Sequence, residues 1–157
     1  MMINKNALLI TQVQHQQLPF HLLLLADPSE EIVREYLPHS TCFIGKLNDT
    51  IVATLVVIEL NNTSLEIKNL AVHEEMQSNG FGKQLLAFAA DYAHKLGYKT
   101  LVIGTGNSSI HQLHLYQKVG FEMVRLVKNH FVQHYKTPIV ENTIVCKHLV
   151  ILEKELG

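Results

Sequence analysis

The chain has 157 residues, of which 47% are apolar and 17% charged, and this composition fits one globular domain over residues 1–157 and excludes a disordered chain. Thirteen basic residues against fourteen acidic ones leave a formal charge of −1, so no general positive field would hold a nucleic acid.

The first half of the chain predicts two short helices among strands. Ser29 follows Asp27-Pro28 and can accept a hydrogen bond from the first turn of a helix, so we expect it to cap the second helix. Asn48-Asp49 and residues 61–64 have the composition of tight turns between β-rich runs. The predicted elements are a strand over 7–13, helices over 18–26 and 30–37, and an antiparallel meander of strands over 41–47, 50–60 and 65–72.

A long amphipathic helix is expected after a glycine-containing loop. Apolar residues recur at helical spacing over 81–96, and Gly97 is a natural residue to end the helix. The continuous apolar run over 100–105 then indicates a strand covered on both faces. A strand, a helix and a further strand in this order predict a parallel crossover.

The last third predicts one more helix and two strands. Helical spacing resumes at Ile110, and Gly120 ends that helix before a strand over 121–124. Residues 127–142 are typical of a helical turn plus loop that Pro138 ends, and the apolar, β-branched run over 143–152 predicts a final strand.

The loop over 77–83 has the features of an anion site. The first turn of a helix exposes backbone amides that lack internal partners, and Gly80 and Gly82 let a ligand approach the backbone closely. A pyrophosphate would fit there. The alternative is a glycine-tolerant helix cap without a ligand.

Three segments around this loop resemble the GNAT superfamily of N-acetyltransferases. They are Leu70-Ala71-Val72, the loop Gln77-x-x-Gly80-x-Gly82, and the later run Leu115-Tyr116-Gln117-Lys118-Val119-Gly120-Phe121. The resemblance implies an α/β fold with a mixed, largely antiparallel sheet flanked by helices. It also implies an acetyl-CoA-dependent enzyme that moves the acetyl group to a primary amine by direct attack in a ternary complex.

The resemblance further implies where acetyl-CoA binds. The pyrophosphate would lie on the 77–83 loop, and the pantetheine arm would lie along the strand before it, which in the family separates from the next parallel strand. Asn107 would reach the pantetheine, although it stands nine residues before Tyr116, with Ser109 at the family's usual position. The implied cofactor-binding residues are Leu70, Ala71, Val72, Gln77, Asn79, Gly80, Phe81, Gly82, Lys83 and Asn107.

Two residues are the candidates for proton transfer. Tyr116 matches the family tyrosine that protonates the departing thiolate, and a phenol with a pKa near ~10 suits that role. Its alternative is an ordinary amphipathic tyrosine on a helix face. Glu66 is the candidate base that takes a proton from the attacking amine, and its alternative is a solvated strand residue.

The hairpin register suggests a partner for Glu66. If residues 61–64 close an ordinary hairpin, Glu59 falls directly opposite Glu66, and two neighbouring carboxylates can relieve their repulsion by keeping one proton. The alternative is a bulge that shifts the register and separates the two residues.

The cysteines and the apolar stretches of the sequence indicate the cellular compartment in which the protein is expected. Cys42 and Cys146 lie in apolar runs, which suits buried thiols better than a disulfide framework. The apolar stretch 22–26 is too short to cross a bilayer, and the Gln- and His-rich segment before it does not resemble the cationic start of a signal peptide. We therefore expect a cytoplasmic protein without a membrane or nucleic acid partner.

The remaining expectations concern ligands and partners. His111 and His114 lack the further ligands that a metal site needs, so no metal cofactor is expected. The acceptor would be a small-molecule or peptide amine, drawn to the acidic residues Asp27, Glu30, Glu31 and Glu35. A homodimer is possible. The alternative function is a sensor module that binds acyl-CoA without turning it over.

Overall fold

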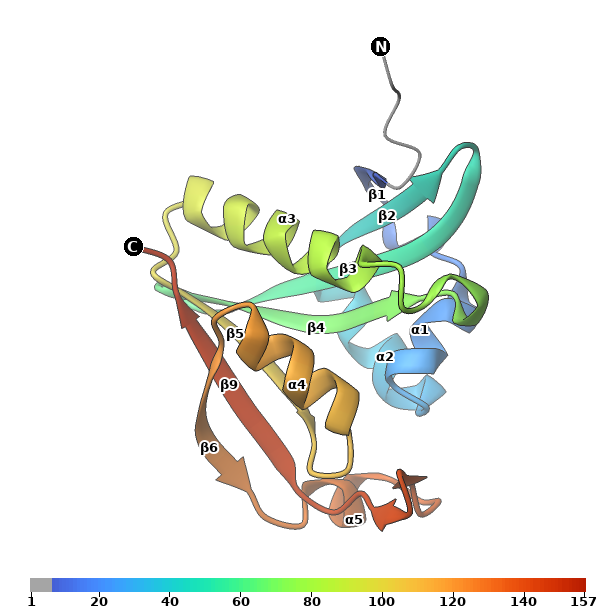
Figure 1. The fold of residues 1–157 in the computed structure, drawn as a ribbon, viewed down its shortest axis with the longest axis vertical. Helices are drawn as coiled ribbons and strands as arrows, with labels where there is room; N and C mark the ends of the chain where they lie inside the picture. The colour runs from blue at the N-terminus through green and yellow to red at the C-terminus, as the bar shows by residue number, and fades with distance from the viewer. Residues whose placement is uncertain (1–6) are drawn as a thin grey trace.

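The computed structural model describes residues 7–157 and is drawn in Figure 1. Its first half contains β1 (Leu9–Val13), the 3₁₀ helix η1 (His15–Gln17), α1 (Phe20–Ala26), α2 (Glu30–Tyr36), the 3₁₀ helix η2 (Leu37–His39), β2 (Thr41–Leu47), β3 (Thr50–Asn61) and β4 (Ser64–Val72). The Ser29 hydroxyl accepts a 3.3 Å hydrogen bond from the Ile32 amide, so the predicted cap of the second helix is confirmed.

The second half contains the 3₁₀ helix η3 (Glu74–Met76), α3 (Phe81–Lys95), β5 (Thr100–Gly106), α4 (Ile110–Lys118), β6 (Glu122–Val127), α5 (His130–His134), β7 (Val140–Glu141), β8 (Ile144–Val145) and β9 (Leu149–Glu155). Gly97 and Gly120 follow α3 and α4 with φ of +89° and +104°. Both glycines therefore end their helices in the left-handed conformation, as predicted.

Seven strands form the main sheet in the order β1-β2-β3-β4-β5-β9-β6. Only the β4–β5 pair is parallel among these neighbours, because α3 carries the chain across one face between them. The predicted mixed, largely antiparallel sheet flanked by helices is confirmed. That residues 1–157 form one domain remains a prediction.

The two faces of the sheet are covered by different helices. Figure 1 shows α3 and α4 in front of the sheet and α1 and α2 behind it. Leu55 faces the front core with Leu85 of α3, whereas its neighbour Val56 faces the rear core with Leu23 of α1 and Val33 of α2. This alternation follows from the two-residue period of a strand.

The parallel strands β4 and β5 separate beyond their first four residues. They are paired from Ser64 with Thr100 to Ile67 with Ile103, and within the described chain no pairing joins residues 68–72 to 104–106. β4 stays with β3 as far as Val72, while β5 stays with β9. Figure 1 shows the resulting fork. The separation expected from the family resemblance is therefore present.

The single final strand predicted over 143–152 is wrong. β8 and β9 are separate strands, and residues 146–148 between them are not extended sheet. The Asn107 side-chain oxygen accepts hydrogen bonds from the amides of Lys147 (2.7 Å) and His148 (2.8 Å). Because these amides bond to a side chain, they are not available to a neighbouring strand. The hydrogen bond from Lys147 to Asn107, 40 residues earlier in the sequence, thus interrupts a segment whose local composition favours a single strand.

The predicted pairing of Glu59 with Glu66 is also wrong. Ile58 lies opposite Glu66 and Glu59 lies opposite Leu65, because a bulge at Leu60 adds one residue to β3 beside the turn. A one-residue shift moves a side chain to the other face, so the two carboxylates do not share one. The Tyr98 hydroxyl instead donates a 2.7 Å hydrogen bond to Glu59 Oε1, and this bond raises the pKa of Tyr98 to about 12.

Candidate functional site

The loop between β4 and α3 is braced by its own side chains. The Gln77 amide nitrogen donates to the Val72 carbonyl (3.1 Å), and the Asn79 amide nitrogen donates to the carbonyls of Met76 (3.0 Å) and Gln77 (3.1 Å). Gly80, with φ +82°, turns the chain into α3. Gln77 and Asn79 therefore shape the loop rather than reach freely into solvent.

The first turn of α3 contains backbone donors that have no partner within the helix itself. The first helical amide bond runs from Gln84 to the Gly80 carbonyl (3.1 Å), so the amides of residues 81–83 precede it. The Phe81 side chain is buried in the core, and only its backbone can face a ligand. A Cβ on Gly82 would lie 3.4 Å from Leu115 of α4, so this turn packs against α4. Amides exposed at a helix start can donate to an anion, and these lie beside the fork.

Leu70, Ala71 and Val72 line the β4 side of the fork. Leu70 and Val72 pack against the front core, while Ala71 is buried on strand β4 opposite Thr54. Beyond Ile67 the β4 edge that faces β5 has no strand partner in the described chain. Its backbone is therefore open to an extended ligand, as an edge strand is to a further strand.

Tyr116 lies on the front side of the sheet. It is buried in the front core, and its ring lies 6.1 Å from that of Phe121 between centroids. Burial raises the pKa of Tyr116 well above its ordinary value. The phenol is protonated at neutral pH with or without this shift, so it carries a proton that it can donate.

Glu66 lies on the opposite face, among groups that a second bulge brings together. Lys68 is the extra residue between Ile67 and Asn69 in β4, so Asn69 faces the rear layer with Glu66 instead of the front. The Lys68 ammonium lies 3.9 Å from Glu66 Oε1 and 5.5 Å from the centre of the Tyr36 ring. One strand thus presents a carboxylate, an ammonium and an amide to the same side.

A polar network beside Glu66 joins three distant segments. The Asn69 amide nitrogen donates to the Tyr36 hydroxyl (2.9 Å) and the Leu23 carbonyl (3.0 Å). Its side-chain oxygen is buried and has no hydrogen-bond partner within residues 7–157. Asp27 Oδ1 accepts hydrogen bonds from the Tyr135 hydroxyl (2.8 Å) and the Ser29 amide (3.2 Å). We call Asp27, Tyr36, Lys68, Asn69 and Tyr135 the rear cluster.

Two titratable groups in and beside the rear cluster have perturbed pKa values. Burial raises the pKa of Asp27, and the hydrogen bond from Tyr135 offsets part of that rise. Burial, followed by the charge of His134, lowers the pKa of His130 in the neighbouring helix α5. Perturbed groups of this kind are typical of functional sites.

Of the residues in the rear cluster, only Asp27 was predicted from the sequence to lie near the acceptor. Asp27 was expected near the acceptor because of the acidic residues around it, but Glu30 and Glu31 are instead exposed and paired with Arg34 (2.8 Å) and Lys136 (3.8 Å). Tyr135 is 108 residues from Asp27, and no local pattern connects them. The Tyr-Lys-x-Pro run at 135–138 was the one available signal, since it marks where α5 ends.

The Asn107 side chain forms hydrogen bonds to the backbone of a distant segment. Its oxygen accepts from two backbone amides, as described above, and its amide nitrogen donates to the Val145 carbonyl (3.2 Å). These bonds tie the end of β5 to the segment between β8 and β9. A direct contact of Asn107 with pantetheine remains a prediction.

Within residues 7–157, no group of three or more His, Cys, Asp or Glu side chains is arranged to hold a metal ion. The absence of a metal cofactor remains a prediction. None of the helices in the same part of the chain is long and apolar enough to cross a membrane. Cys42 and Cys146 are buried free thiols, as predicted.

Comparisons with known proteins agree with this geometry. The model of the acetyltransferase (GNAT) family matches residues 10–121. A Bacillus subtilis protein described as the uncharacterized N-acetyltransferase YvbK is 46% identical over 137 residues, which are 87% of this chain and 88% of that protein.

Two solved structures are similar over nearly their whole length. The IAA acetyltransferase from Bacillus cereus is 38% identical with a TM-score of 0.92, and the match covers 95% of this chain and 99% of that one. A GNAT family acetyltransferase from Elizabethkingia anophelis with acetyl-CoA bound is 42% identical with a TM-score of 0.91, over 94% and 97% of the two chains.

Proposed function

Because this chain belongs to the GNAT family and is an acetyl-CoA-dependent N-acetyltransferase, we propose that it transfers the acetyl group directly to a primary amine in a ternary complex. The observation that carries the proposal is the β4–β5 fork, which opens beside the 77–83 loop and separates Tyr116 on one face from Glu66 on the other. A thioester in the fork would meet an amine from the rear and an acid from the front.

The cofactor lies with its pyrophosphate on the first turn of α3. The amides of residues 81–83 donate to phosphate oxygens, Gly80 and Gly82 allow the approach, and Lys83 adds a positive charge. Gln77 and Asn79 hold the loop in shape. The pantetheine arm bonds to the open backbone of residues 70–72. The 42% identical Elizabethkingia protein has acetyl-CoA bound, which supports this part of the proposal.

The chemical step is an aminolysis of the thioester. The amine nitrogen forms a bond to the carbonyl carbon, the carbon–sulfur bond breaks, and its electron pair leaves with sulfur. Tyr116, which is protonated at neutral pH, donates a proton to that sulfur. Glu66 receives the proton that the amine loses, directly or through water.

The acceptor amine binds on the rear face beside Glu66. The rear cluster supports this placement, because it combines a partly buried carboxylate at Asp27 with the orphaned oxygen of Asn69. Both groups can accept hydrogen bonds from an ammonium. The acceptor is a small-molecule or peptide amine, and a cytoplasmic location, where acetyl-CoA is available, completes the proposal.

A thiol-release assay across amine classes tests the function. Polyamines, aminoglycosides, amino acids and peptide N-termini are each mixed with acetyl-CoA, and IAA is included because a 38% identical protein carries it in its name. Release of CoA that depends on one amine class supports the proposal. Tight CoA binding without release for any amine would favour the alternative, an acyl-CoA sensor module.

A further inference from the structure

The Lys68 side chain carries a positive charge at the opening of the fork. The last pair between β4 and β5 joins Ile67 to Ile103, so Lys68 is the first residue of β4 beyond that pairing. Its ammonium lies on the rear face, 5.5 Å from the centre of the Tyr36 ring. A cation is therefore present on the face where the proposed function places the acceptor amine, and an ammonium substrate would be repelled by it.

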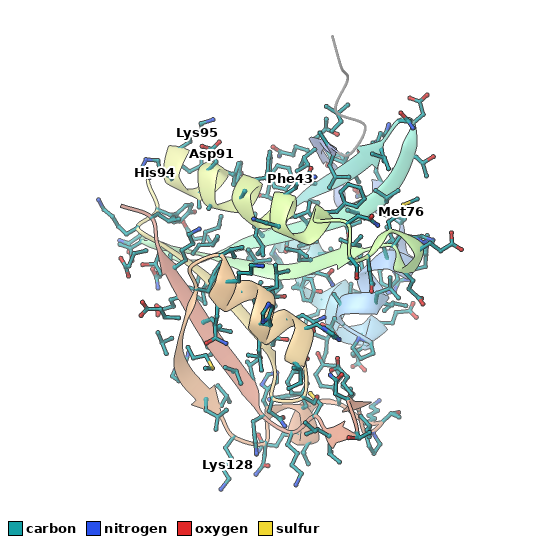
Figure 2. The ribbon with its side chains drawn as sticks, viewed as in Figure 1. Phe43, Met76, Asp91, His94, Lys95 and Lys128 are labelled. Atoms are coloured by element: carbon teal, nitrogen blue, oxygen red, sulfur yellow. The ribbon has the colours of Figure 1, made fainter. Side chains whose placement is uncertain are left out.

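The Lys68 ammonium has hydrogen-bond donors that the protein does not use. Within residues 7–157 it donates no hydrogen bond, and its one ion-pair contact, with Glu66 Oε1 at 3.9 Å, is longer than a hydrogen bond. By contrast, Lys95 lies 2.8 Å from Asp91 at the far end of α3 (Figure 2). The Lys68 side chain is 37% exposed, so an anionic ligand can reach its three N–H donors.

The spacing of the Glu66 and Lys68 charges matches a substrate that carries both signs. The two groups lie 3.9 Å apart on the same side of β4. A polyamine would be attracted by the carboxylate and repelled by the ammonium at one place. An amino acid carries an ammonium and a carboxylate on the same carbon, so its two charges are also close neighbours. With its ammonium at Glu66 and its carboxylate at Lys68, each charge meets one of opposite sign.

Asn69 determines which end of such a substrate lies beside Glu66. Its side chain is 3% exposed, and its Oδ1 has no hydrogen-bond partner within the described chain. The amide nitrogen of the same side chain is already used, because it donates to the Tyr36 hydroxyl and the Leu23 carbonyl. The remaining oxygen can only accept, so it can bond to an ammonium and not to a carboxylate.

We propose that the acceptor is a free amino acid whose carboxylate binds to Lys68 and whose ammonium binds beside Glu66 and Asn69. The inference rests on the proposed function, because it requires the amine to approach the thioester from the rear face. It narrows the acceptor to a small molecule with a free carboxylate next to its amine. A polyamine lacks that carboxylate, and at a peptide N-terminus an uncharged amide takes its place. The products are an N-acetylamino acid and CoA, and the carboxylate forms and breaks no bond.

The test compares L-amino acids with their carboxamides, which keep the side chain and the amine and lack the negative charge. Thiol release with saturating acetyl-CoA gives kcat/KM for each amino acid, for the matching amide and for spermidine. A hydrogen bond to a charged group changes an equilibrium constant about tenfold or more. In wild type the best amino acid should therefore have a kcat/KM about tenfold above that of its own amide.

Three variants show whether Lys68 causes this preference. Lys68→Met removes the ammonium, keeps a long apolar side chain against the Tyr36 ring, and should bring the ratio of the two kcat/KM values close to one. Lys68→Arg keeps the charge and should keep the ratio. Lys95→Met also removes a lysine that contacts a carboxylate, but on the front of the sheet, and should keep the ratio.

The outcomes separate the substrate class from the proposed function. If wild type uses amides or spermidine as well as any amino acid, the substrate class is overturned while transfer to an amine stands, and this comparison needs no variant. A ratio that survives in Lys68→Met, or an equal loss for the amino acid and its amide, would overturn the role of Lys68. If no amine of any class releases CoA, the proposed function itself fails.

Discussion

The Tyr135 hydroxyl donates a 2.8 Å hydrogen bond to Asp27 Oδ1 and so joins the segment after α5 to the loop between α1 and α2. Asp27 receives a second bond from the Ser29 amide, two residues further on in the same loop. The carboxylate is therefore held between the turn that starts α2 and a segment more than a hundred residues later.

Tyr135→Phe should destabilise the protein at neutral pH by about 1.5–3 kcal/mol, the usual contribution of a hydrogen bond to a charged group. The ring is kept, so packing changes little. The variant leaves a partly buried carboxylate with one donor fewer, and the pKa of Asp27 should rise further because the bond from Tyr135 lowers it. Urea unfolding at neutral pH measures the effect, and an unchanged free energy of unfolding would show that the bond contributes nothing.

The pH dependence of stability should reveal Asp27 directly. Its pKa is raised in the folded state, so the folded protein holds this proton more tightly than the unfolded chain does. The contribution is therefore fully present below the unfolded pKa and is lost as the pH rises through the folded one. Asp27→Asn should remove this loss between acidic and neutral pH, whereas Glu30→Gln on the exposed start of α2 should not. Identical curves for Asp27→Asn and wild type would contradict the assignment.

Gly82→Glu should abolish CoA binding because it adds bulk and a negative charge where the pyrophosphate rests. Gly82→Gln is the matched variant that adds nearly the same bulk without the charge, and it should retain more affinity than Gly82→Glu. Gly82→Ala should keep the fold, since its Cβ would meet Leu115 at an ordinary contact distance of 3.4 Å. Calorimetric titration with CoA measures all three, and normal binding by Gly82→Glu would remove the loop from the cofactor site.

Tyr116→Phe should lower turnover by about 10²–10⁴ while CoA affinity changes little, if the phenol protonates the leaving thiolate. The ring stays in the core beside Phe121, so the folded structure should survive. Single-turnover thiol release isolates the chemical step from product release. A wild-type rate in that assay would leave Tyr116 as a packing residue.

Glu66→Gln should reduce turnover sharply, whereas Glu59→Gln should match wild type at every pH. The register shift at Leu60 separates the two residues, so Glu59 is a control of the same chemistry on the same hairpin. Glu59→Gln should instead lower the pKa of Tyr98, because the hydrogen bond to the Glu59 carboxylate is the largest cause of its rise, ahead of burial. Spectroscopic titration of tyrosine follows that change. Equal turnover in Glu66→Gln and wild type would mean that the amine loses its proton by another route.

Local physics explains which features the sequence determined by itself. The hydrophobic period over 81–96 and the glycines after each helix specify α3 and α4, because helix formation depends on neighbours three and four residues apart. The glycine loop and the Tyr116 motif are also contiguous, so both could be located from the sequence. The meander of β2, β3 and β4 follows from its two short turns.

Only the tertiary structure decided how distant groups meet. The bulges at Leu60 and Lys68 moved Glu59 away from Glu66 and turned Asn69 to the face of Glu66, and one inserted residue leaves no clear trace in a hydrophobic pattern. Asn107 divided an apolar run that looked like one strand, because its side chain took the amides which that strand would have used. The bond between Asp27 and Tyr135 depends on how two segments 108 residues apart meet in the fold, which a local period of two or 3.6 residues does not specify.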